Sequence, residues 1–190
     1  PVVSSSIPLI MTKPTVKFKC LSGRKPVIIQ ILPALVRGGV ERGTVEIAQA
    51  IQAAGGHAVV ISNGGPLVRH IERCGGKHIA LPMHVKNPLR WPGLRRRLKT
   101  IFQAECADIV HVRSRVPAWL ALTLAKSMGI ATISTVHSRF AAGSFFKRRY
   151  NAKILDAGQV IAISNYVHDM ITSRYMGVED RLTVVHRGVD

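Results

Sequence analysis

Short apolar segments alternate with helical ones along most of this chain, and this alternation restricts its possible folds more than any other feature. Residues 27–32 are apolar at every position but Gln30, which is typical of a strand buried on both faces. A helical pattern follows over 41–54 and ends at Gly55-Gly56. Strands that alternate with helices of this length predict right-handed crossovers and a parallel sheet. We therefore expect an α/β, Rossmann-like, doubly wound fold.

The same alternation continues to the end of the chain. Further strands are expected at 57–62, 78–81, 108–112, 131–136, 159–163 and 182–185. Helices are expected between them at 66–74, 93–103, 118–128, 145–156 and 165–175. Residues 26–190 thus form one domain. Residues 1–25 mix Ser, Pro and Lys without periodicity, and we expect them to be a flexible N-terminal tail.

The chain combines a strong positive charge with a large apolar fraction. Its 190 residues include 27 Lys and Arg against 10 Asp and Glu, for a formal charge of +17, and 47% of them are hydrophobic. That apolar fraction excludes disorder as the main state. The charge favours an anionic partner, which could be nucleic acid, a membrane surface or a phosphorylated small molecule. Composition does not choose among these three.

Cysteine spacing and hydropathy bear on the compartment. Cys20, Cys74 and Cys106 lie far apart, with no pair spaced for a zinc site, so neither a disulfide framework nor a metal centre is expected. No apolar run approaches the roughly 18 residues that span a bilayer, and the N-terminus does not resemble a secretory signal. We expect a cytoplasmic protein that is soluble or bound peripherally to a membrane.

The loop after the first strand is the first candidate for ligand binding. In open α/β sheets, ligands bind beyond the carboxyl ends of the strands, where the strand order reverses. Gly38 and Gly39 lie there, and the N–H groups of the helix that follows could cradle a phosphate. The alternative is a simple strand-to-helix turn, and no G-x-G-x-x-G pattern decides between the two.

Polar residues at other strand ends extend this candidate site. After the fourth strand, Arg113 and Ser114 are expected to point into the cleft, where a guanidinium suits a phosphate or carboxylate. We interpret His111, inside that strand, as a buried and hydrogen-bonded histidine rather than a catalytic one. His137 and Ser138 follow the fifth strand, and Ser164-Asn165 the sixth. Together these residues predict a shared polar rim.

Five segments, in order and spacing, carry a resemblance to a known family. They are Gly-Gly-Val-Glu-Arg at 38–42, Asp-Ile-Val-His-Val at 108–112, Thr-Val-His at 135–137, Ile-Ala-Ile-Ser-Asn-Tyr-Val at 161–167 and Arg-Leu-Thr-Val-Val-His-Arg-Gly-Val-Asp at 181–190. Over 26–190 the chain resembles the N-terminal domain of GT-B fold glycosyltransferases, specifically the retaining family 4 group.

This resemblance implies an acceptor-side half-enzyme. A C-terminal domain with an E-x7-E element would bind most of the donor, and the sequence ends before such a domain, so this chain alone is expected to be inactive. Joined to it, the chain would transfer a sugar with retention from a nucleotide-sugar, a co-substrate rather than a cofactor. The acceptor would be a glycan, lipid-linked or lipopolysaccharide molecule of the cell envelope.

The resemblance also suggests roles for single residues. His137 would lie near the reacting sugar as the catalytic residue, and Gly38 and Gly39 would approach the donor diphosphate. Arg113 stands where many relatives have histidine, which could mean an anionic acceptor. The residues expected to bind the acceptor are Glu41, Arg42, Arg113, Ser114 and Ser138.

Two basic segments leave alternatives open. The helix containing 94–102 is read as an ordinary surface helix with an apolar stripe, or as a membrane contact. Residues 145–150 combine aromatic and cationic side chains, which suits the headgroup region of an anionic bilayer. The rival function is a non-catalytic basic module that binds nucleic acid or phosphorylated ligands. No nucleic-acid-binding motif is present, and aromatic residues make up only 5% of the chain, which leaves few stacking platforms.

Overall fold

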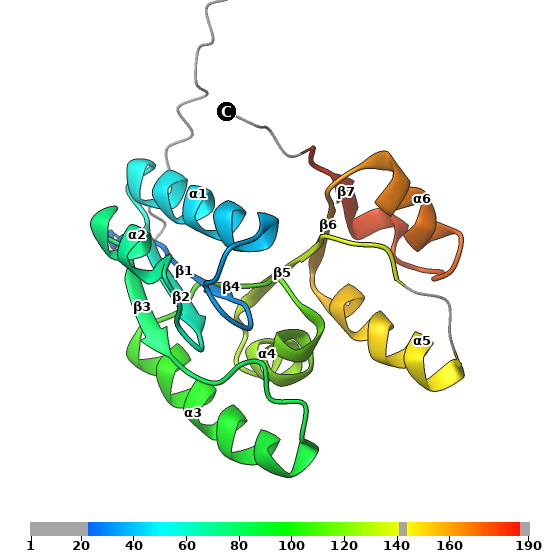
Figure 1. Cartoon of the computed structure of the whole chain (residues 1–190), viewed down its shortest axis with the longest axis horizontal. Coiled ribbons are helices and arrows are strands. Elements are labelled where there is room, and N and C mark those ends of the chain that lie inside the picture. Colours follow the sequence, from blue (N-terminus) through cyan, green and yellow to red (C-terminus); the bar gives the residue numbers. More distant parts are fainter. Residues whose placement is uncertain (1–22, 141–143, 187–190) are drawn as a thin grey trace, which may run out of the picture.

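A computed structural model describes residues 23–140 and 144–186 of the chain. Within these residues, seven parallel strands form one sheet in the order β3-β2-β1-β4-β5-β6-β7, with helices on both faces (Figure 1). The strands are β1 Val27–Ile31, β2 His57–Ser62, β3 Lys77–Ala80, β4 Ile109–Val112, β5 Ala131–Val136, β6 Gln159–Ala162 and β7 Leu182–Val184. The predicted α/β, doubly wound sheet is confirmed.

The helices occupy the predicted intervals. The α-helices are α1 Gly39–Ala53, α2 Val68–Arg73, α3 Trp91–Ala104, α4 Arg115–Ser127, α5 Phe145–Ala152 and α6 Asn165–Thr172. Three short 3-10 helices add η1 Pro88–Arg90, η2 Lys153–Asp156 and η3 Glu179–Arg181. The segment predicted as one helix over 145–156 is therefore α5 continued by η2.

The start of α4 corrects the predicted boundary. A helix was expected from residue 118, but α4 begins at Arg115. Pro117 falls in the first turn, where backbone N–H groups have no acceptor within the helix, so the missing N–H removes no helical hydrogen bond. As a result, the helix begins immediately after Ser114, at the edge of the candidate site.

Alternate residues of the central strands supply two apolar cores. Ile28 and Val60 pack on the face covered by α1 and α2. Ile29 and Val110 pack on the other face, toward α3 and α4 (Figure 1). Phe102 of α3 is almost fully buried in this second core. The period of two along each strand thus explains why 27–32 is apolar throughout.

The predicted apolar stripe of α3 is confirmed. Leu94, Leu98 and Phe102 are buried, and Ile101 packs against the same core. This helix therefore covers the sheet with one face and leaves its cationic residues on the others, as an ordinary amphipathic surface helix does.

The strand order reverses between β1 and β4. The chain moves outward from β1 to β2 and β3 on one side, and from β4 to β7 on the other. Ile31 and Val112 are paired in register, so both strands end at the same level. The loops after β1 and β4 diverge from there and leave a crevice. The sequence placed its candidate site at this reversal, and the structure has the reversal at that position.

Both ends of the sequence lie outside the described residues. These are residues 1–22, most of the expected tail, and 187–190, the close of the last family-like segment. Arg24, within the expected tail, forms an ion pair of 2.7 Å with Asp108, just before β4. The same carboxylate accepts a hydrogen bond of 2.7 Å from the Val27 N–H. The ion pair therefore holds Arg24 at the amino-terminal edge of the sheet.

Candidate functional site

A buried polar network lies under the crevice. Gln30 is fully buried in β1, and its Nε2 donates a hydrogen bond of 3.0 Å to the Thr44 carbonyl in α1. Its Oε1 accepts a hydrogen bond of 3.2 Å from the Arg113 guanidinium, which follows β4. The side chain of Gln30 therefore connects both elements that border the reversal point. Sequence reasoning missed Gln30, although a polar residue inside an otherwise apolar strand was a signal for it.

Arg113 is held at the floor of the crevice. Its side chain is almost completely buried, with 4% exposure, and its backbone N–H donates to the Ile31 carbonyl over 3.0 Å. A buried guanidinium is positioned by the protein groups around it rather than by solvent. Arginine also keeps its positive charge at physiological pH. Arg113 therefore supplies a fixed positive charge beneath any ligand in the crevice.

His111 supports the site from inside the sheet. It is buried, and its Nε2 lies 2.7 Å from Thr135 Oγ1 on the neighbouring strand β5. Burial, with the nearby Arg113 and then His137, lowers the pKa of His111 from 6.5 to about 3. The imidazole is consequently neutral at physiological pH. Our interpretation of His111 as a buried, hydrogen-bonded histidine is confirmed.

Two cavities open at the carboxyl edge of the sheet. The first, here called the α1–β6 cavity, has a volume of about 200 Å³ and lies between α1, β6 and the residues after β7. The second, the β4–β5 cavity, has a volume of about 220 Å³ and lies between the loops after β1, β4 and β5. Both are lined by Arg113, Thr135 and His137. These three residues therefore form a common wall between two spaces that could hold two reactants.

The β4–β5 cavity gathers five of the eight predicted site residues. It is lined by Glu41, Arg113, Ser114, His137 and Ser138. Arg115 also lines it, and its guanidinium donates to Asn151 Oδ1 over 2.7 Å and lies 5.8 Å from the centre of the Phe140 ring. Two guanidinium groups and one carboxylate thus share this cavity, whose electrostatics favour a ligand with negative or strongly polar groups.

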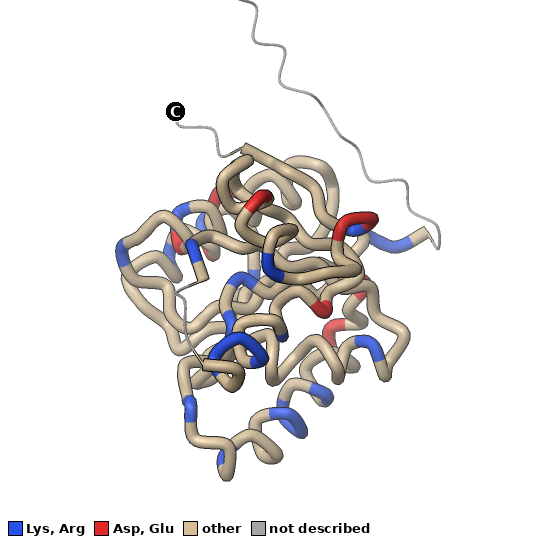
Figure 2. The backbone as a smooth tube through the Cα atoms, turned by 90° about the vertical axis from the view of Figure 1, so that its right-hand side faces the viewer, with Lys and Arg blue, Asp and Glu red and all other residues tan. Residues whose placement is uncertain are grey.

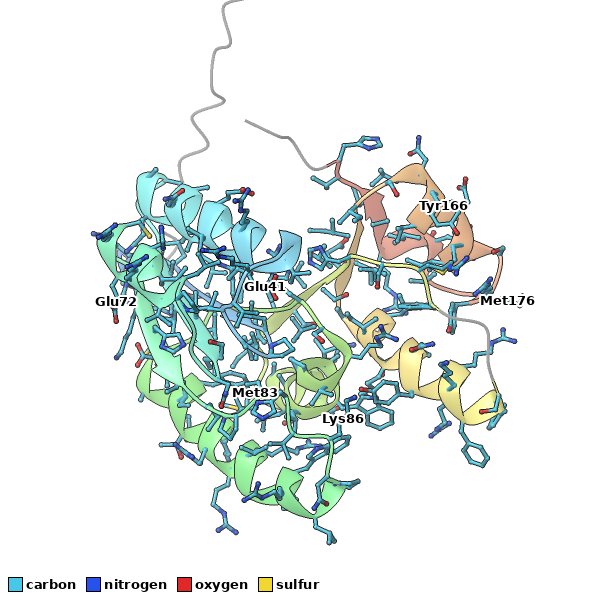
Figure 3. All side chains as sticks on the ribbon, in the orientation of Figure 1. Glu41, Glu72, Met83, Lys86, Tyr166 and Met176 are labelled. Carbon is cyan, nitrogen blue, oxygen red and sulfur yellow. The ribbon has the colours of Figure 1, made fainter. Side chains whose placement is uncertain are left out.

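Three predicted residues line neither cavity. Arg42 is exposed on α1, and Gly38 and Gly39 form the exposed start of that helix. Gly38 has an extended backbone, with φ of 167°, so its conformation does not demand glycine. A Cβ at this position would overlap Oε2 of Glu41, the far end of a flexible side chain that would have to move aside. Figure 3 shows Glu41 near the centre of the molecule, at the start of α1.

The residues that follow β6 do not form the polar rim that was expected of them. Ser164 was expected on the polar rim, but its hydroxyl accepts a hydrogen bond of 3.3 Å from the Val167 N–H and caps α6. Neither Ser164 nor Asn165 lines the two cavities. The β6 side of the site is instead formed by Ile161 and Ile163. The rim is therefore polar near β4 and β5 and apolar near β6.

Among the residues that the structure describes, no group of three or more His, Cys, Asp or Glu side chains is arranged to hold a metal ion. Within the same ranges, none of the helices has the length and apolar character needed to cross a membrane.

The fold and site together define a class of protein. The Rossmann-like fold is shared with the glycosyltransferase from Rickettsia africae ESF-5, at 36% sequence identity and a TM-score of 0.76. The match covers 87% of this chain and 44% of that one. HepE of Anabaena, in complex with UDP and glucose, shares the fold at 15% identity and a TM-score of 0.70. That match covers 87% of this chain and 45% of HepE. The chain thus has the architecture of one half of a GT-B glycosyltransferase.

The family follows from the sequence match. The model of Glycosyltransferase Family 4 matches residues 37–190, so this chain belongs to that family and corresponds to its N-terminal domain. Comparison with curated proteins found no match. The chain spans less than half the length of the two solved proteins.

Proposed function

We propose that this chain is the acceptor-side half of a retaining glycosyltransferase. Joined to a C-terminal donor-binding domain, it transfers a hexosyl group from a nucleotide-sugar to a glycan, lipid-linked or lipopolysaccharide acceptor of the cell envelope. By itself it is inactive. The observation that carries the proposal is the pair of cavities at the reversal point, which share Arg113, Thr135 and His137 as a common wall.

Structural relatives support the choice of substrates. HepE of Anabaena was solved with UDP-glucose, and another protein of this fold is the lipopolysaccharide outer core galactosyltransferase WaaB, at 14% identity and a TM-score of 0.62. The WaaB match covers 86% of this chain and 46% of that one. A nucleotide-sugar donor and an envelope acceptor are therefore the substrates that we extend to this chain.

The two cavities separate the roles of the substrates. The acceptor occupies the β4–β5 cavity, where Glu41, Ser114 and Ser138 offer hydrogen bonds to its hydroxyl groups. Arg42, which lies outside this cavity, contacts the parts of a longer acceptor that extend past α1. His137, which faces both cavities, holds the reacting groups of donor and acceptor together.

The reaction needs little acid or base from the protein. The bond between the anomeric carbon and the diphosphate oxygen breaks, and the acceptor oxygen forms its bond on the same face of that carbon. The acceptor proton passes to the leaving diphosphate. Charge stabilisation then dominates, and the N–H groups at Gly38 and Gly39 supply it from the start of α1. No metal or organic cofactor enters this scheme.

The proposal includes a cytoplasmic location with peripheral attachment to the inner face of the cell membrane. In this proposal the nucleotide-sugar donor comes from the cytoplasm. A lipid-linked acceptor would bring the enzyme to the bilayer. The formal charge of +17 supports attraction to an anionic surface.

Substitution of His137 by alanine tests the proposed site. In the protein extended past Asp190 to include the C-terminal domain, His137→Ala should lower kcat/KM about 100-fold or more, because a group that contacts the transition state is removed. Sugar transfer is measured by mass spectrometry of the product. The matched control is His84→Ala, an exposed histidine that lines neither cavity, which should keep the parent rate.

Thermal unfolding of both variants shows whether the domain is intact. Parent-like turnover in a folded His137→Ala protein would remove this residue from the site. Reading the coding sequence beyond Asp190 provides a second check, since the absence of an α/β domain with an E-x7-E element would favour a non-catalytic binding module.

A further inference from the structure

Three helices on one face of the sheet contain no acidic residue. Helices α3, α4 and α5 lie on the same face of the sheet (Figure 1), and none contains Asp or Glu. Their cationic residues are Arg95, Arg96, Arg97 and Lys99 in α3, Arg115 and Lys126 in α4, and Lys147, Arg148 and Arg149 in α5. Figure 2 shows Lys and Arg along the lower part of the backbone, with most Asp and Glu above them.

The acidic residues are concentrated elsewhere. On the opposite face of the sheet, α1 contains Glu41 and Glu46, and α2 contains Glu72. Figure 3 shows Glu72 far from Lys86, which precedes α3. The cations of α3 and α5 therefore add to one another's potential, while the adjoining Glu105 and Asp156 are paired with Lys77 and Lys153.

Exposed apolar side chains stand at one end of this layer. Phe145 and Phe146, in the first turn of α5, are 73% and 80% exposed, and Leu89, in η1 just before α3, is 88% exposed. Helices that follow parallel strands run antiparallel to them, so both helices begin at the carboxyl edge of the sheet (Figure 1). We call Leu89, Phe145 and Phe146 the apolar tips.

Contacts between aromatic rings join α3, α4 and α5, the helices beside the tips. Trp91, at the start of α3, lies 5.9 Å from Trp119 of α4, which in turn lies 6.2 Å from Tyr150 of α5. Trp119 Nε1 also donates to the Tyr150 carbonyl over 3.2 Å. The tips thus belong to one preformed surface, which lowers the entropy lost when it binds a flat partner.

The end of α5 and the start of η2, rather than the tips themselves, adjoin the proposed acceptor cavity. Arg115, which lines the β4–β5 cavity, donates a hydrogen bond to Asn151 of α5, and Ile154 of η2 also lines that cavity. Near the other end of α5, Met176 is 95% exposed (Figure 3), and the preceding Tyr175 donates to the Arg148 carbonyl over 3.4 Å. The exposed apolar side chains therefore lie toward the start of α5, and the cavity lies toward its end.

We propose that the apolar tips and the surrounding cations of α3 and α5 dock on an anionic phospholipid bilayer. The phenyl rings enter the boundary between headgroups and acyl chains, while Lys147 and Arg149 contact lipid phosphates. A nucleic acid would satisfy the cations, but it offers no apolar phase for three exposed side chains. This surface rests on the proposed function only in its consequence, that a lipid-linked acceptor enters the β4–β5 cavity from the membrane.

Vesicle flotation with the 190-residue chain tests the surface without any donor or acceptor. Vesicles of phosphatidylcholine alone are compared with vesicles containing about 30% phosphatidylglycerol, at about 0.15 M salt. The parent chain should float only with the anionic vesicles. Phe145→Ser/Phe146→Ser should weaken this binding about tenfold or more, and Lys147→Ser/Arg149→Ser about twentyfold.

Matched variants outside the proposed surface provide the control. Arg69→Ser/Arg73→Ser removes the same charge from α2, and Tyr166→Ser removes an exposed aromatic side chain from α6. Both should bind within twofold of the parent, roughly. Circular dichroism checks that every variant is folded.

Three results would overturn the proposal. They are equal weakening by the α2 and α5 charge variants, parent-like binding of the Phe145→Ser/Phe146→Ser protein, and a shift with duplex DNA at the same salt without any vesicle binding. Because the assay contains no sugar substrate, failure of the proposed transferase function would leave the vesicle results unchanged.

Discussion

At the scale of single residues, the candidate site depends on buried polar groups that hold the cavity walls in place. Gln30 and His111 line neither cavity, yet they contact Arg113 and Thr135, which line both. These hydrogen bonds within the protein replace the hydrogen bonds to water that the polar atoms lose on burial. The positions of Arg113 and Thr135 are therefore set inside the sheet, away from any substrate.

His111 makes the stability of this protein depend on pH. Its pKa is about 3 in the folded chain and near 6.5 in the unfolded chain, so the unfolded state binds more protons between these values. The free energy of unfolding should therefore fall as the pH drops below 6.5, by up to about 1.4 kcal/mol per pH unit from this residue. His111→Gln should remove that part of the slope, as measured by urea unfolding at several pH values. An unchanged slope in a cooperatively folding variant would contradict a buried, neutral His111.

Residue-scale features divide into those that the sequence predicts and those that it does not. Alternation along 108–112 was enough to interpret His111 as buried, and the strand ends pointed to Arg113 and His137. The bond between Gln30 and Arg113 joins residues 83 positions apart, and side-chain pairing over such a separation depends on register. The expected rim at Ser164 failed because a Ser that precedes a helix also serves as an N-cap, which is its role here.

At the scale of elements, the start of α1 governs how the loop after β1 meets the site. Gly38 precedes the helix, and the Glu41 side chain fills the space where a Cβ at residue 38 would lie. A carboxylate at a helix N-terminus is favoured by the helix dipole. The helix dipole therefore stabilises the Glu41 carboxylate at the mouth of the β4–β5 cavity.

Gly38→Ala should separate activity from stability. The added methyl displaces a flexible Glu41 side chain rather than backbone, so the free energy of unfolding should change by less than about 1 kcal/mol. Transfer by the extended enzyme should fall, because Glu41 is moved within the cavity. The double variant with Glu41→Ala should show less additional loss from Gly38→Ala than the parent does. Additive losses in that cycle of kinetic measurements would argue against a coupling between the two residues.

Element boundaries show where local sequence signals reach their limit. Strands β2 and β5 run over the residues expected, and β2 is an apolar run with a glycine turn on each side. Helix α4 begins earlier than expected, since Pro117 is compatible with a first turn and does not by itself mark the boundary. The segment 145–156 changes from α-helix to 3-10 helix at Lys153, a change that hydrophobic periodicity does not encode.

At the scale of the whole molecule, the fold determines where the positive charge lies on the surface. The composition gave a net charge of +17 without a location, and the fold places nine of the 27 Lys and Arg on α3, α4 and α5, which contain no acidic residue. The apolar tips stand at the starts of α3 and α5, and the other end of α5 adjoins the β4–β5 cavity. Docking on a bilayer would therefore orient the acceptor side of the site toward the membrane.

The central claim is that this chain is the acceptor-side half of a retaining transferase. Its most direct test compares the 190-residue chain with the protein extended past Asp190, each incubated with nucleotide-sugars and envelope lipid extracts. Donor consumption and the anomeric configuration of the product are followed by NMR. The account predicts transfer only by the extended protein, with the donor's configuration retained. Equal transfer by the short chain, an inverted product, or an intact donor with the folded extended protein would contradict it.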